Sequence, residues 1–330
     1  MKKVFIDGSA GTTGLRIRER LAQRRDLEVV VLPDEVRKDV GARRAALNAA
    51  DVAFLCLPDA AAIEAVSLVD NPETVVIDTS TAHRTADGWE YGFPELAGRR
   101  ARIAKAKRIA NPGCHATGFI ALIEPLTRAG LLDRDVALTA FSLTGYSGGG
   151  KKMIGDYVEK LRVERCGLRD LETAQQLNPQ PTTLNPQLYL GGRQYALGQK
   201  HKHLPEIVKL CGLEVAPAFC PIVVPHYSGM ETTVPVFAKD LRGTAEDVAR
   251  VYRETYAQGL VHFVEGSDEE GFLSSARLSG LDTLEVAIYG NEERLLLVSR
   301  FDNLGKGASG AAIQNMNLVL GVPEDTGLSI

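Results

Sequence analysis

The sequence predicts an α/β fold in two parts: a doubly wound parallel sheet, followed by an α+β domain with a mixed or antiparallel sheet. Its 330 residues, 45% of them hydrophobic, are enough for two buried cores. The first 113 residues alternate short apolar runs with helical patterns, which is typical of a parallel sheet covered by helices. From about residue 136, strand-like runs dominate and helical patterns are fewer, which indicates a second sheet.

The first part contains a series of short apolar runs that we expect to be strands: Lys3–Asp7, Glu28–Leu32, Val52–Leu57, Thr74–Asp78 and Arg108–Ala110. Between the first two runs, apolar residues recur among charges as in an amphipathic helix, which we expect over Thr13–Arg24. Strands that alternate with helices of this length connect by right-handed crossovers. The predicted arrangement is Rossmann-like.

The second part contains a further series of strand-like runs: Val136–Leu143, Glu214–Val224, Thr232–Phe237, Leu284–Tyr289 and Arg294–Phe301. Helices are expected at about 148–162, 245–258 and 308–320, and Leu177–Gly192 is expected to be a loop. The last helix follows a glycine-rich turn and is expected to return to the first domain. The predicted domains are therefore 1–113 with the C-terminal segment of about 303–330, and 114–302.

Composition and charge exclude several classes of protein. The net charge is −4 and no basic stripe with interleaved aromatic residues is present, so no nucleic-acid partner is expected. No apolar window is long enough to span a bilayer, and no signal-peptide pattern follows the first residues. The five cysteines lie at scattered spacings that suit neither disulfides nor zinc. A cytoplasmic protein with small-molecule partners is the expectation.

A glycine-rich loop joins the first strand to the first helix, and it reads Gly8-Ser9-Ala10-Gly11-Thr12-Thr13-Gly14. Glycines let the backbone approach a pyrophosphate, and the helix start offers free N–H groups. A tight turn needs glycine for steric reasons alone, but the position at the first βα junction favours dinucleotide binding.

The preference between the two nicotinamide cofactors stays open at this point. Asp34 and Glu35 after the second strand suit a ribose hydroxyl, whereas the basic residues that follow suit a 2′-phosphate: Arg37, Lys38, Arg43 and Arg44.

Cys114 is the most informative residue of the chain. Arg108–Ala110 ends a strand, Pro112-Gly113 makes a turn, and Cys114 opens a helical apolar pattern. A thiol at a helix N-terminus has its thiolate favoured by the helix dipole, and the thiolate is the nucleophile. Most free cysteines are buried and structural instead, which suits Cys56, Cys211 and Cys220; Cys114 is also preferred over Cys166.

The chain resembles the N-acetyl-γ-glutamyl-phosphate reductases of arginine biosynthesis, in particular their shorter second type, almost from end to end. The resemblance rests on these motifs: Phe5-Ile6-Asp7-Gly8 with Gly11-Thr12-Thr13-Gly14, Asp78-Thr79-Ser80-Thr81-Ala82-His83-Arg84, Asn111-Pro112-Gly113-Cys114, Gly145-Tyr146-Ser147-Gly148-Gly149-Gly150-Lys151, His201-Lys202-His203-Leu204-Pro205-Glu206 and Asp302-Asn303-Leu304-Gly305-Lys306-Gly307. At Thr13 the sequence departs from the longer members of the family, which have an aromatic residue there.

This resemblance implies a reaction and a cofactor. NADPH would reduce N-acetyl-γ-glutamyl phosphate to N-acetylglutamate semialdehyde with release of phosphate, and Cys114 would be the nucleophile. The loop from Gly8 to Gly14 would hold the pyrophosphate of the cofactor, and Asn303, Lys306 and Gly307 would complete the nicotinamide pocket. By analogy with two-domain dehydrogenases, a homo-oligomer (dimer or tetramer) is expected.

Hydride would reduce the thioester to a hemithioacetal, whose developing oxygen needs a proton donor, and histidine suits this task. His201 and His203 are the candidates, with His226 behind them and Glu206 as a carboxylate to orient the ring. A His-x-His pair on a strand shares one face and also suits a metal, but no third ligand stands at a suitable spacing, so no metal is expected. His115 is placed lower, because the residue after the nucleophile is expected to point elsewhere.

The phosphate and the carboxylate of such a substrate need cationic partners. Arg84, just beyond the strand Thr74–Asp78, and Lys151, with Lys152 next to it, are the candidates, against the alternative of solvated surface charges. Rival interpretations keep the same scaffold with another acyl chain (an aspartate-semialdehyde or lysine-pathway enzyme), or make the chain a nicotinamide-sensing regulator or a zinc hydrolase.

Overall fold

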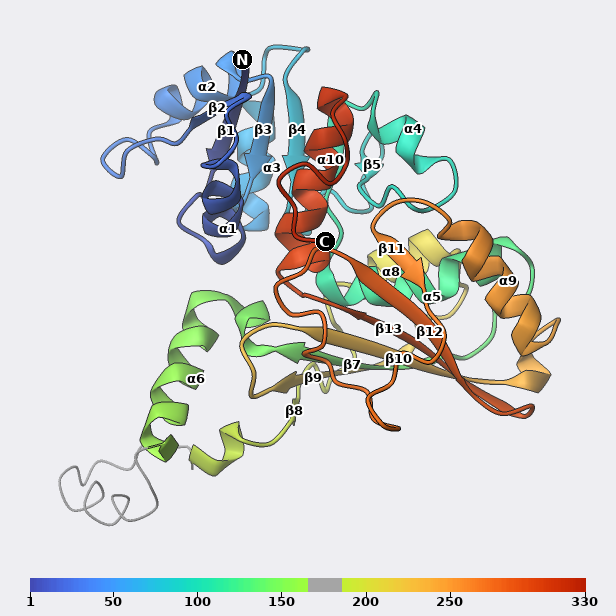
Figure 1. Cartoon of the computed structure of the whole chain (residues 1–330). Coiled ribbons are helices and arrows are strands. Elements are labelled where there is room, and N and C mark those ends of the chain that lie inside the picture. The colour runs from blue at the N-terminus through green and yellow to red at the C-terminus, as the bar shows by residue number, and fades with distance from the viewer. Residues whose placement is uncertain (166–185) are drawn as a thin grey trace, which may run out of the picture.

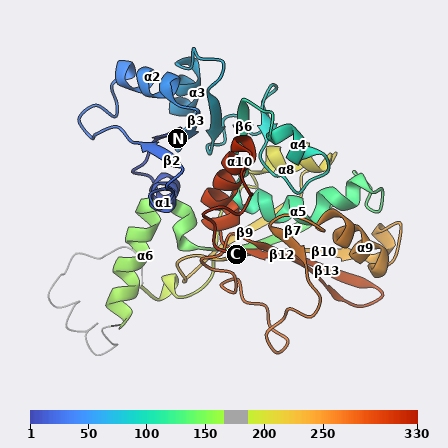
Figure 2. The ribbon, with the colours of Figure 1, turned by 45° about the horizontal axis from the view of Figure 1, so that its top comes forward.

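The computed structural model describes residues 1–165 and 186–330 (Figure 1). Cys166 and most of the predicted loop 177–192 lie outside these residues. A parallel sheet with its helices forms the upper part of the view in Figure 1, and a second sheet with its own helices forms the lower part. Helix α10 lies between the two parts in both Figure 1 and Figure 2.

The first sheet is parallel throughout, which confirms the predicted doubly wound arrangement. Its strand order is β2-β1-β3-β4-β6-β5. The strands are β1 (Lys2–Asp7), β2 (Leu27–Val30), β3 (Val52–Leu55), β4 (Val75–Asp78), β5 (Glu90–Tyr91) and β6 (Arg108–Ala110). Every residue of β3 and β4 is buried, as expected for strands with helices on both faces.

Helices cover both faces of this sheet. They are α1 (Thr12–Leu21), α2 (Val40–Ala49), α3 (Asp59–Ser67), α4 (Arg99–Ile103) and α10 (Gly310–Leu320). Ala312, Ile313 and Met316 of α10 share a buried cluster with Val4 and Ile6 of β1, so the C-terminal helix packs on the first sheet. The division of the chain at residues 113 and 302 stays a prediction.

The second sheet is mixed, with the strand order β11-β12-β13-β10-β7-β9-β8. Its strands are β7 (Thr139–Gly145), β8 (Arg193–Gln194), β9 (Ala218–Val224), β10 (Met230–Phe237), β11 (Val261–Phe263), β12 (Leu284–Gly290) and β13 (Arg294–Phe301). The helices α5 (Cys114–Arg128), α8 (Leu204–Cys211) and α9 (Ala245–Thr255) contribute to one large apolar core with this sheet.

Helix α5 joins the two parts, because it starts at the end of β6 and runs over the second sheet. The 3-10 turn η1 (Tyr146–Gly149) and helix α6 (Gly150–Arg165) follow β7 and approach the first domain from the other side. A Cβ atom added at Gly150 would lie 3.8 Å from Thr12 Oγ1, so the starts of α6 and α1 are neighbours, as Figure 2 also shows. These two connections place both domains around one cavity.

Candidate active site

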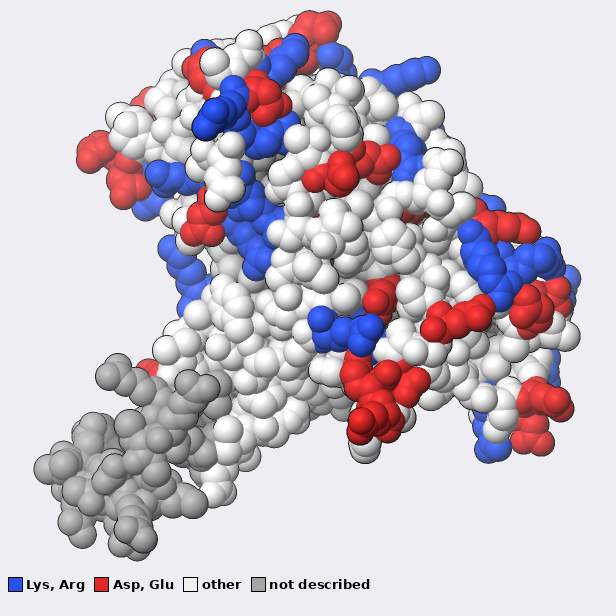
Figure 3. Space-filling view, in the orientation of Figure 1, with Lys and Arg blue, Asp and Glu red and all other residues white. Residues whose placement is uncertain are grey.

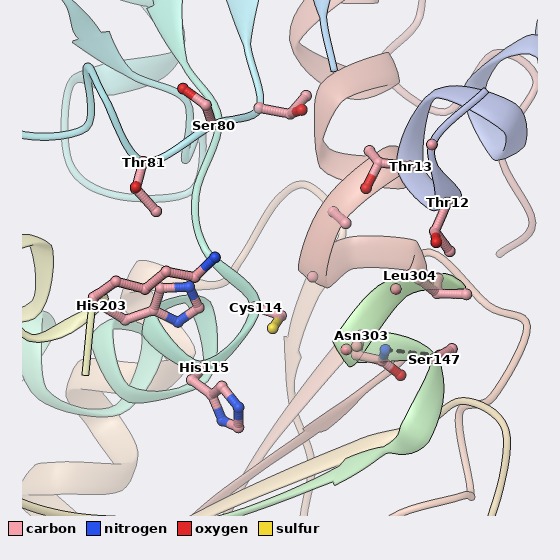
Figure 4. A pocket seen from close by; sticks show the side chains of 18 of the residues that line it. Thr12, Thr13, Ser80, Thr81, Cys114, His115, Ser147, His203, Asn303 and Leu304 are labelled. Carbon is pink, nitrogen blue, oxygen red and sulfur yellow. Dashed lines mark hydrogen bonds between the residues drawn. The ribbon is translucent and has the colours of Figure 1, made fainter. Parts of the chain in front are cut away.

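A cavity of about 550 Å³ lies at the carboxyl ends of β1, β3, β4 and β6, where a doubly wound sheet binds its ligands. The second domain closes it with η1 and the segment 195–203, and the segment 303–308 completes the lining. In Figure 4, Cys114 stands between His203 and His115 on one side and Thr12, Thr13, Asn303 and Leu304 on the other.

The glycine loop divides into a packing half and a lining half. Gly8 has φ +86°, and a Cβ there would lie 2.3 Å from the carbonyl oxygen of Cys56; at Gly14 it would lie 2.5 Å from Gly8 O. These two glycines are therefore required by close packing. Gly11 has no such neighbour within 3.5 Å and lines the cavity together with Thr12, Thr13 and Gly14, whereas Gly8, Ser9 and Ala10 are not among the lining residues.

The start of α1 suits a bound pyrophosphate. Its N-cap residue is Gly11, no side chain caps the first turn, and no acidic residue lies in that turn. The first N–H groups of the helix therefore remain available to an anion.

Asn303 and Gly307 line the cavity, but Lys306 does not. Asn303 Oδ1 accepts from Gly229 N at 3.0 Å and its Nδ2 donates to Ser147 Oγ at 3.0 Å. Gly307 belongs to the π-helix Gly305–Ser309, and a Cβ there would lie 3.1 Å from Cys114 Cβ. A side chain at position 307 would crowd the cysteine.

Lys306 points away from the cavity into a buried ion pair. Its Nζ lies 2.7 and 2.9 Å from the two carboxylate oxygens of Glu95 and also bonds Gln314. The side chain is 1% exposed. Contrary to what the resemblance implied, Lys306 therefore does not contact the cavity but joins the π-helix to Glu95 of the first domain.

Arg84 lines the cavity, but its guanidinium is already engaged. Nη1 donates to Glu206 Oε1 at 2.7 Å, Nε to Asn111 O at 3.0 Å and Nη2 to Thr79 O at 3.2 Å. The other oxygen of Glu206 accepts from Gly113 N at 3.2 Å. Arg84 and Glu206 therefore hold the turn that carries Cys114, instead of presenting a free cation.

Cys114 is the first residue of α5 and is partly exposed to the cavity. Burial raises the pKa of its thiol above the usual cysteine value, although the charges of Arg84 and Lys202 and the backbone N–H of His115 act in the opposite direction. The expectation that the helix start by itself favours the thiolate is therefore corrected, since desolvation is the larger effect.

His201 and His203 both line the cavity, but not from a strand as the sequence suggested. His201 lies in a loop and His203 caps α8. Burial lowers the pKa of His201 to about 4 and that of His203 further below its usual range, so both rings are neutral at pH 7. His203 is 4% exposed, and its Nδ1 has no hydrogen-bond partner among the described residues.

The sequence interpretation placed His115 too low and missed Tyr195. The His115 ring lines the cavity, and its centroid lies 5.4 Å from that of the His201 ring and 5.7 Å from that of the His203 ring. His115 therefore points toward the other two histidines and not away from the site. Its Nδ1 bonds Ser142 Oγ and its Nε2 bonds the Tyr195 hydroxyl, each at 2.7 Å. Tyr195 stands alone between a short strand and a loop, and no local pattern signals it.

The remaining cations differ in their access to the cavity. Lys151 is exposed near the start of α6 and is not among the lining residues, whereas Lys202 is exposed and lines the cavity. Arg43 is buried and pairs with Asp7 and Glu64 at 3.0 and 2.9 Å. Arg37 pairs with Asp34 at 3.3 Å on the surface.

Two general properties of the described residues bear on the rival interpretations. Within residues 1–165 and 186–330, no group of three or more His, Cys, Asp or Glu side chains is arranged to hold a metal ion. In the same residues, no helix has the length and apolar character needed to cross a bilayer. Lys and Arg are interspersed with Asp and Glu on the face drawn in Figure 3.

Comparison with known proteins identifies relatives along nearly the whole chain. The NAD binding domain of semialdehyde dehydrogenases matches residues 3–106, and the dimerisation domain of the same enzymes matches residues 177–303. The N-acetyl-gamma-glutamyl-phosphate reductase 2 of Nostoc sp. is 40% identical, with 99% of each chain covered. The N-acetyl-gamma-glutamyl-phosphate reductase of Brucella anthropi is 44% identical, over 97% of this chain and 98% of the relative.

Solved structures with the same fold are more distant in sequence. Aspartate semialdehyde dehydrogenase II from Vibrio cholerae matches with a TM-score of 0.70 and 19% identity over 97% of this chain and 98% of its own. The enzyme from Candida albicans matches with a TM-score of 0.62 and 14% identity, over 97% and 99%. At these identities the likeness establishes the fold.

Proposed function

The chain belongs to the semialdehyde dehydrogenase family, among its N-acetyl-γ-glutamyl-phosphate reductases, and from this premise we propose that it reduces N-acetyl-γ-glutamyl phosphate to N-acetylglutamate semialdehyde. The observation that carries the proposal is the position of Cys114, between the glycine loop and the histidines in one cavity. NADPH, held at the loop, supplies a hydride when bound.

The first step is acyl transfer to the thiol. Cys114 Sγ attacks the acyl carbon, a C–S bond forms, and the C–O bond to the phosphoryl group breaks with its electron pair leaving on phosphate. Because burial raises the pKa of the thiol, this step needs a nearby base. A neutral imidazole suits that task.

We assign the proton transfers to His203, with His201 as the second candidate. The buried and unpartnered Nδ1 of His203 is a polar atom left for another group, and its Nε2 is close to the Gly113 backbone. The ring would accept the thiol proton and return it to the oxygen of the thioester carbon as that carbon is reduced. The C–S bond then breaks with its electron pair on sulfur, the hydroxyl proton passes by way of the same ring to the thiolate, and the aldehyde is released.

The cofactor site is proposed to consist of the loop Gly8 to Gly14 with Asn303 and Gly307. Gly8 and Gly14 would shape the turn, while the N–H groups after Gly11 would face the pyrophosphate. Ser9 and Ala10 would contact the cofactor only by closure of the loop over it. Lys306 would act on this site through the π-helix, since its own charge is paired with Glu95.

We propose NADP as the cofactor over NAD. Asp34, the acidic residue after β2, pairs with Arg37, and Lys38 is exposed beside them without an ion pair in the described part of the chain. A 2′-phosphate suits this basic segment better than a ribose hydroxyl does. Changing Lys38 to Gln should weaken NADPH binding and leave NADH binding unchanged; equal effects on both would contradict the assignment.

The assembly is proposed to be a homo-oligomer that forms through the second sheet, in line with the dimerisation-domain match. One face of this sheet packs on α5 and α9. The other face carries Phe141, which is 41% exposed, and Leu296, which is 40% exposed. Phe141 stands opposite Thr233 and Leu296 opposite Pro235, so the two apolar residues share a face.

The test of this function is substrate choice. Purified protein with NADP and phosphate should oxidise N-acetylglutamate semialdehyde, and it should oxidise aspartate semialdehyde at a much lower rate. The Cys114→Ser variant should be inactive on both substrates. A preference for aspartate semialdehyde would retain the family and refute the substrate.

A further inference from the structure

Among the residues that the structure describes, the cavity is lined by two cationic side chains, Arg84 and Lys202, and one carboxylate, Asp59. Asp59 is engaged by Thr81, whose backbone N–H and hydroxyl both donate to it. An acyl phosphate brings several negative charges into this space. Which cation receives them follows from what each one already contacts.

Arg84 has little left to offer an anion. Glu206 neutralises its charge at 2.7 Å, and two backbone carbonyl oxygens take further N–H groups. Its side chain is 8% exposed and that of Glu206 is 1% exposed. Drawing Arg84 toward a substrate would leave the buried Glu206 carboxylate without its cationic partner, which is strongly unfavourable.

Lys202 is in the opposite situation. It is exposed, it lines the cavity, and it makes no hydrogen bond or salt bridge with any residue of the described ranges. The Lys202 charge acts to lower the pKa values of Asp59, Cys114, His201 and His203, although burial is the larger effect at each of them and raises the pKa of the thiol. Lys202 lines the same cavity as Cys114, and its ammonium donors are free among the described residues.

We propose that Lys202 is the residue that binds the phosphoryl group of the acyl phosphate and stabilises the departing phosphate. The inference rests on the proposed function, because it assumes an acyl phosphate as substrate. It assigns Lys202 to the phosphate and not to the α-carboxylate, since the phosphate is bonded to the carbon that Cys114 attacks, whereas the carboxylate lies several carbons away. A cation close to the thiol is close to the phosphate.

The contribution of Lys202 is electrostatic. As the C–O bond breaks, its electron pair goes to phosphate, and a compact ammonium with three donors stabilises the growing charge without giving up its proton. Loss of phosphate leaves the same cation to favour the thiolate at the end of the cycle. A single lysine thus serves both anions in turn.

The first experiment uses the charge of an alkylating agent and needs no substrate. Iodoacetate is an anion and iodoacetamide is neutral, so the ratio of their rates at Cys114 reports the local positive charge. We expect the rate with iodoacetate divided by the rate with iodoacetamide to fall at least about threefold in Lys202→Gln. The same ratio should keep its wild-type value in Lys202→Arg and in Lys200→Gln. Lys200 is the matched control because it is exposed two residues away and does not line the cavity. An unchanged ratio in Lys202→Gln would overturn the proposal.

The second experiment identifies the anion. Inorganic phosphate should protect Cys114 of the wild type from iodoacetamide, and Lys202→Gln should need about tenfold more phosphate for the same protection. N-acetylnorvaline, which has only the α-carboxylate, should protect both proteins equally. Loss of its protection in Lys202→Gln, with phosphate protection retained, would assign the residue to the carboxylate and refute the proposal.

The third experiment separates this inference from the proposed function. With the semialdehyde and NADP, the KM for phosphate should rise about tenfold or more in Lys202→Gln, with the KM for NADP unchanged. A wild-type protein inactive on N-acetylglutamate semialdehyde, but with the Lys202-dependent phosphate protection, would refute the substrate and leave the phosphate site standing. An unchanged KM for phosphate in an active Lys202→Gln protein would refute the site alone.

Discussion

At the scale of single residues, the surroundings of Cys114 have opposing effects on the pKa of its thiol. Burial raises the pKa of the thiol, and Arg84 and Lys202 offset part of that effect. In the free protein the thiol form is therefore the resting state, and the thiolate forms when a base takes the proton or the pH rises.

This state predicts a pH dependence. Alkylation of Cys114 by iodoacetamide should still increase as the pH rises through about 8.5, the usual thiol pKa, because a raised pKa moves the plateau to higher pH. Mass spectrometry of the Cys114 peptide after timed labelling measures the rate. A plateau already reached near neutral pH would contradict the account.

Arg84 and Glu206 predict a different kind of defect from the loss of a substrate contact. Arg84→Ala leaves the buried Glu206 carboxylate without its cationic partner, so the free energy of unfolding should fall by about 3–5 kcal/mol. Urea denaturation measures the fall, and the double change Arg84→Ala with Glu206→Gln should recover part of it. A stable Arg84→Ala protein with only a raised KM would restore the substrate-binding assignment.

At this scale the sequence predicted the position of Cys114 better than its surroundings. Strand, turn, cysteine and helix follow one another locally, so the place of Cys114 at the start of α5 was predictable. His115 and Tyr195 meet through a contact 80 residues apart in sequence, which no spacing rule reveals. Lys306 was placed in the cofactor pocket because a motif gives no sign of which side of a helix faces inward.

At the scale of elements, the turn between β1 and α1 combines two demands on glycine. Gly8 and Gly14 make room for neighbouring backbone, while Gly11 leaves open space in the cavity. The same residue type thus serves packing at two positions and ligand access at the third.

Two matched substitutions separate these demands. Gly8→Ala, at φ +86° and against the Cys56 carbonyl, should lower the free energy of unfolding by at least about 1–3 kcal/mol. Gly11→Ala should keep the stability within about 1 kcal/mol and weaken NADPH binding about tenfold or more. Denaturation and fluorescence titration measure the two effects, and a Gly11→Ala protein with unchanged affinity would remove the helix start from the cofactor site.

The longer strands were predictable, but of the strands with two or three residues only β6 was. The central strands appear within a few residues of the predicted runs, because periodicity over several residues reports burial. Strands β5, β8 and β11 have two or three residues each, too few to show a pattern. The histidine segment looked like a strand, but His203 is the N-cap of helix α8, where Pro205 suits the first turn.

At the scale of the whole molecule, the two sheets meet around the cavity, and large apolar side chains remain exposed on one face of the second sheet. Phe141, Phe237 and Leu296 are 41%, 54% and 40% exposed there. Exposed apolar side chains that share a face are typical of an interface, which is the basis of the proposed assembly.

A charge on this face should prevent assembly. Phe141→Asp is expected to lower the mass seen in analytical ultracentrifugation to that of one chain, because an aspartate would be buried without a partner. Ile63→Asp on α3, at a residue 56% exposed in the first domain, is the control and should leave the mass unchanged. An oligomer that survives Phe141→Asp would place the interface elsewhere.

The change in pattern along the chain predicted the order of the two sheets, and the glycine-rich turn before α10 predicted that this helix returns to the first sheet. The closure of the cavity was not predictable from the sequence, because it depends on how η1 and α6 pack against α1. That meeting is a property of tertiary packing and leaves no local signal.

The thioester on Cys114 is the central claim, and a burst experiment tests it most directly. Protein is mixed with N-acetylglutamate semialdehyde and NADP in the absence of phosphate, and the reduced cofactor is followed by absorbance. The account predicts a burst of one reduced cofactor per site, with an acyl group on Cys114 found by mass spectrometry, and steady turnover only after phosphate is added. The contradicting result would be turnover in the presence of phosphate, but neither a burst nor an acyl adduct in its absence. Phosphate would then act on the aldehyde without a covalent enzyme intermediate.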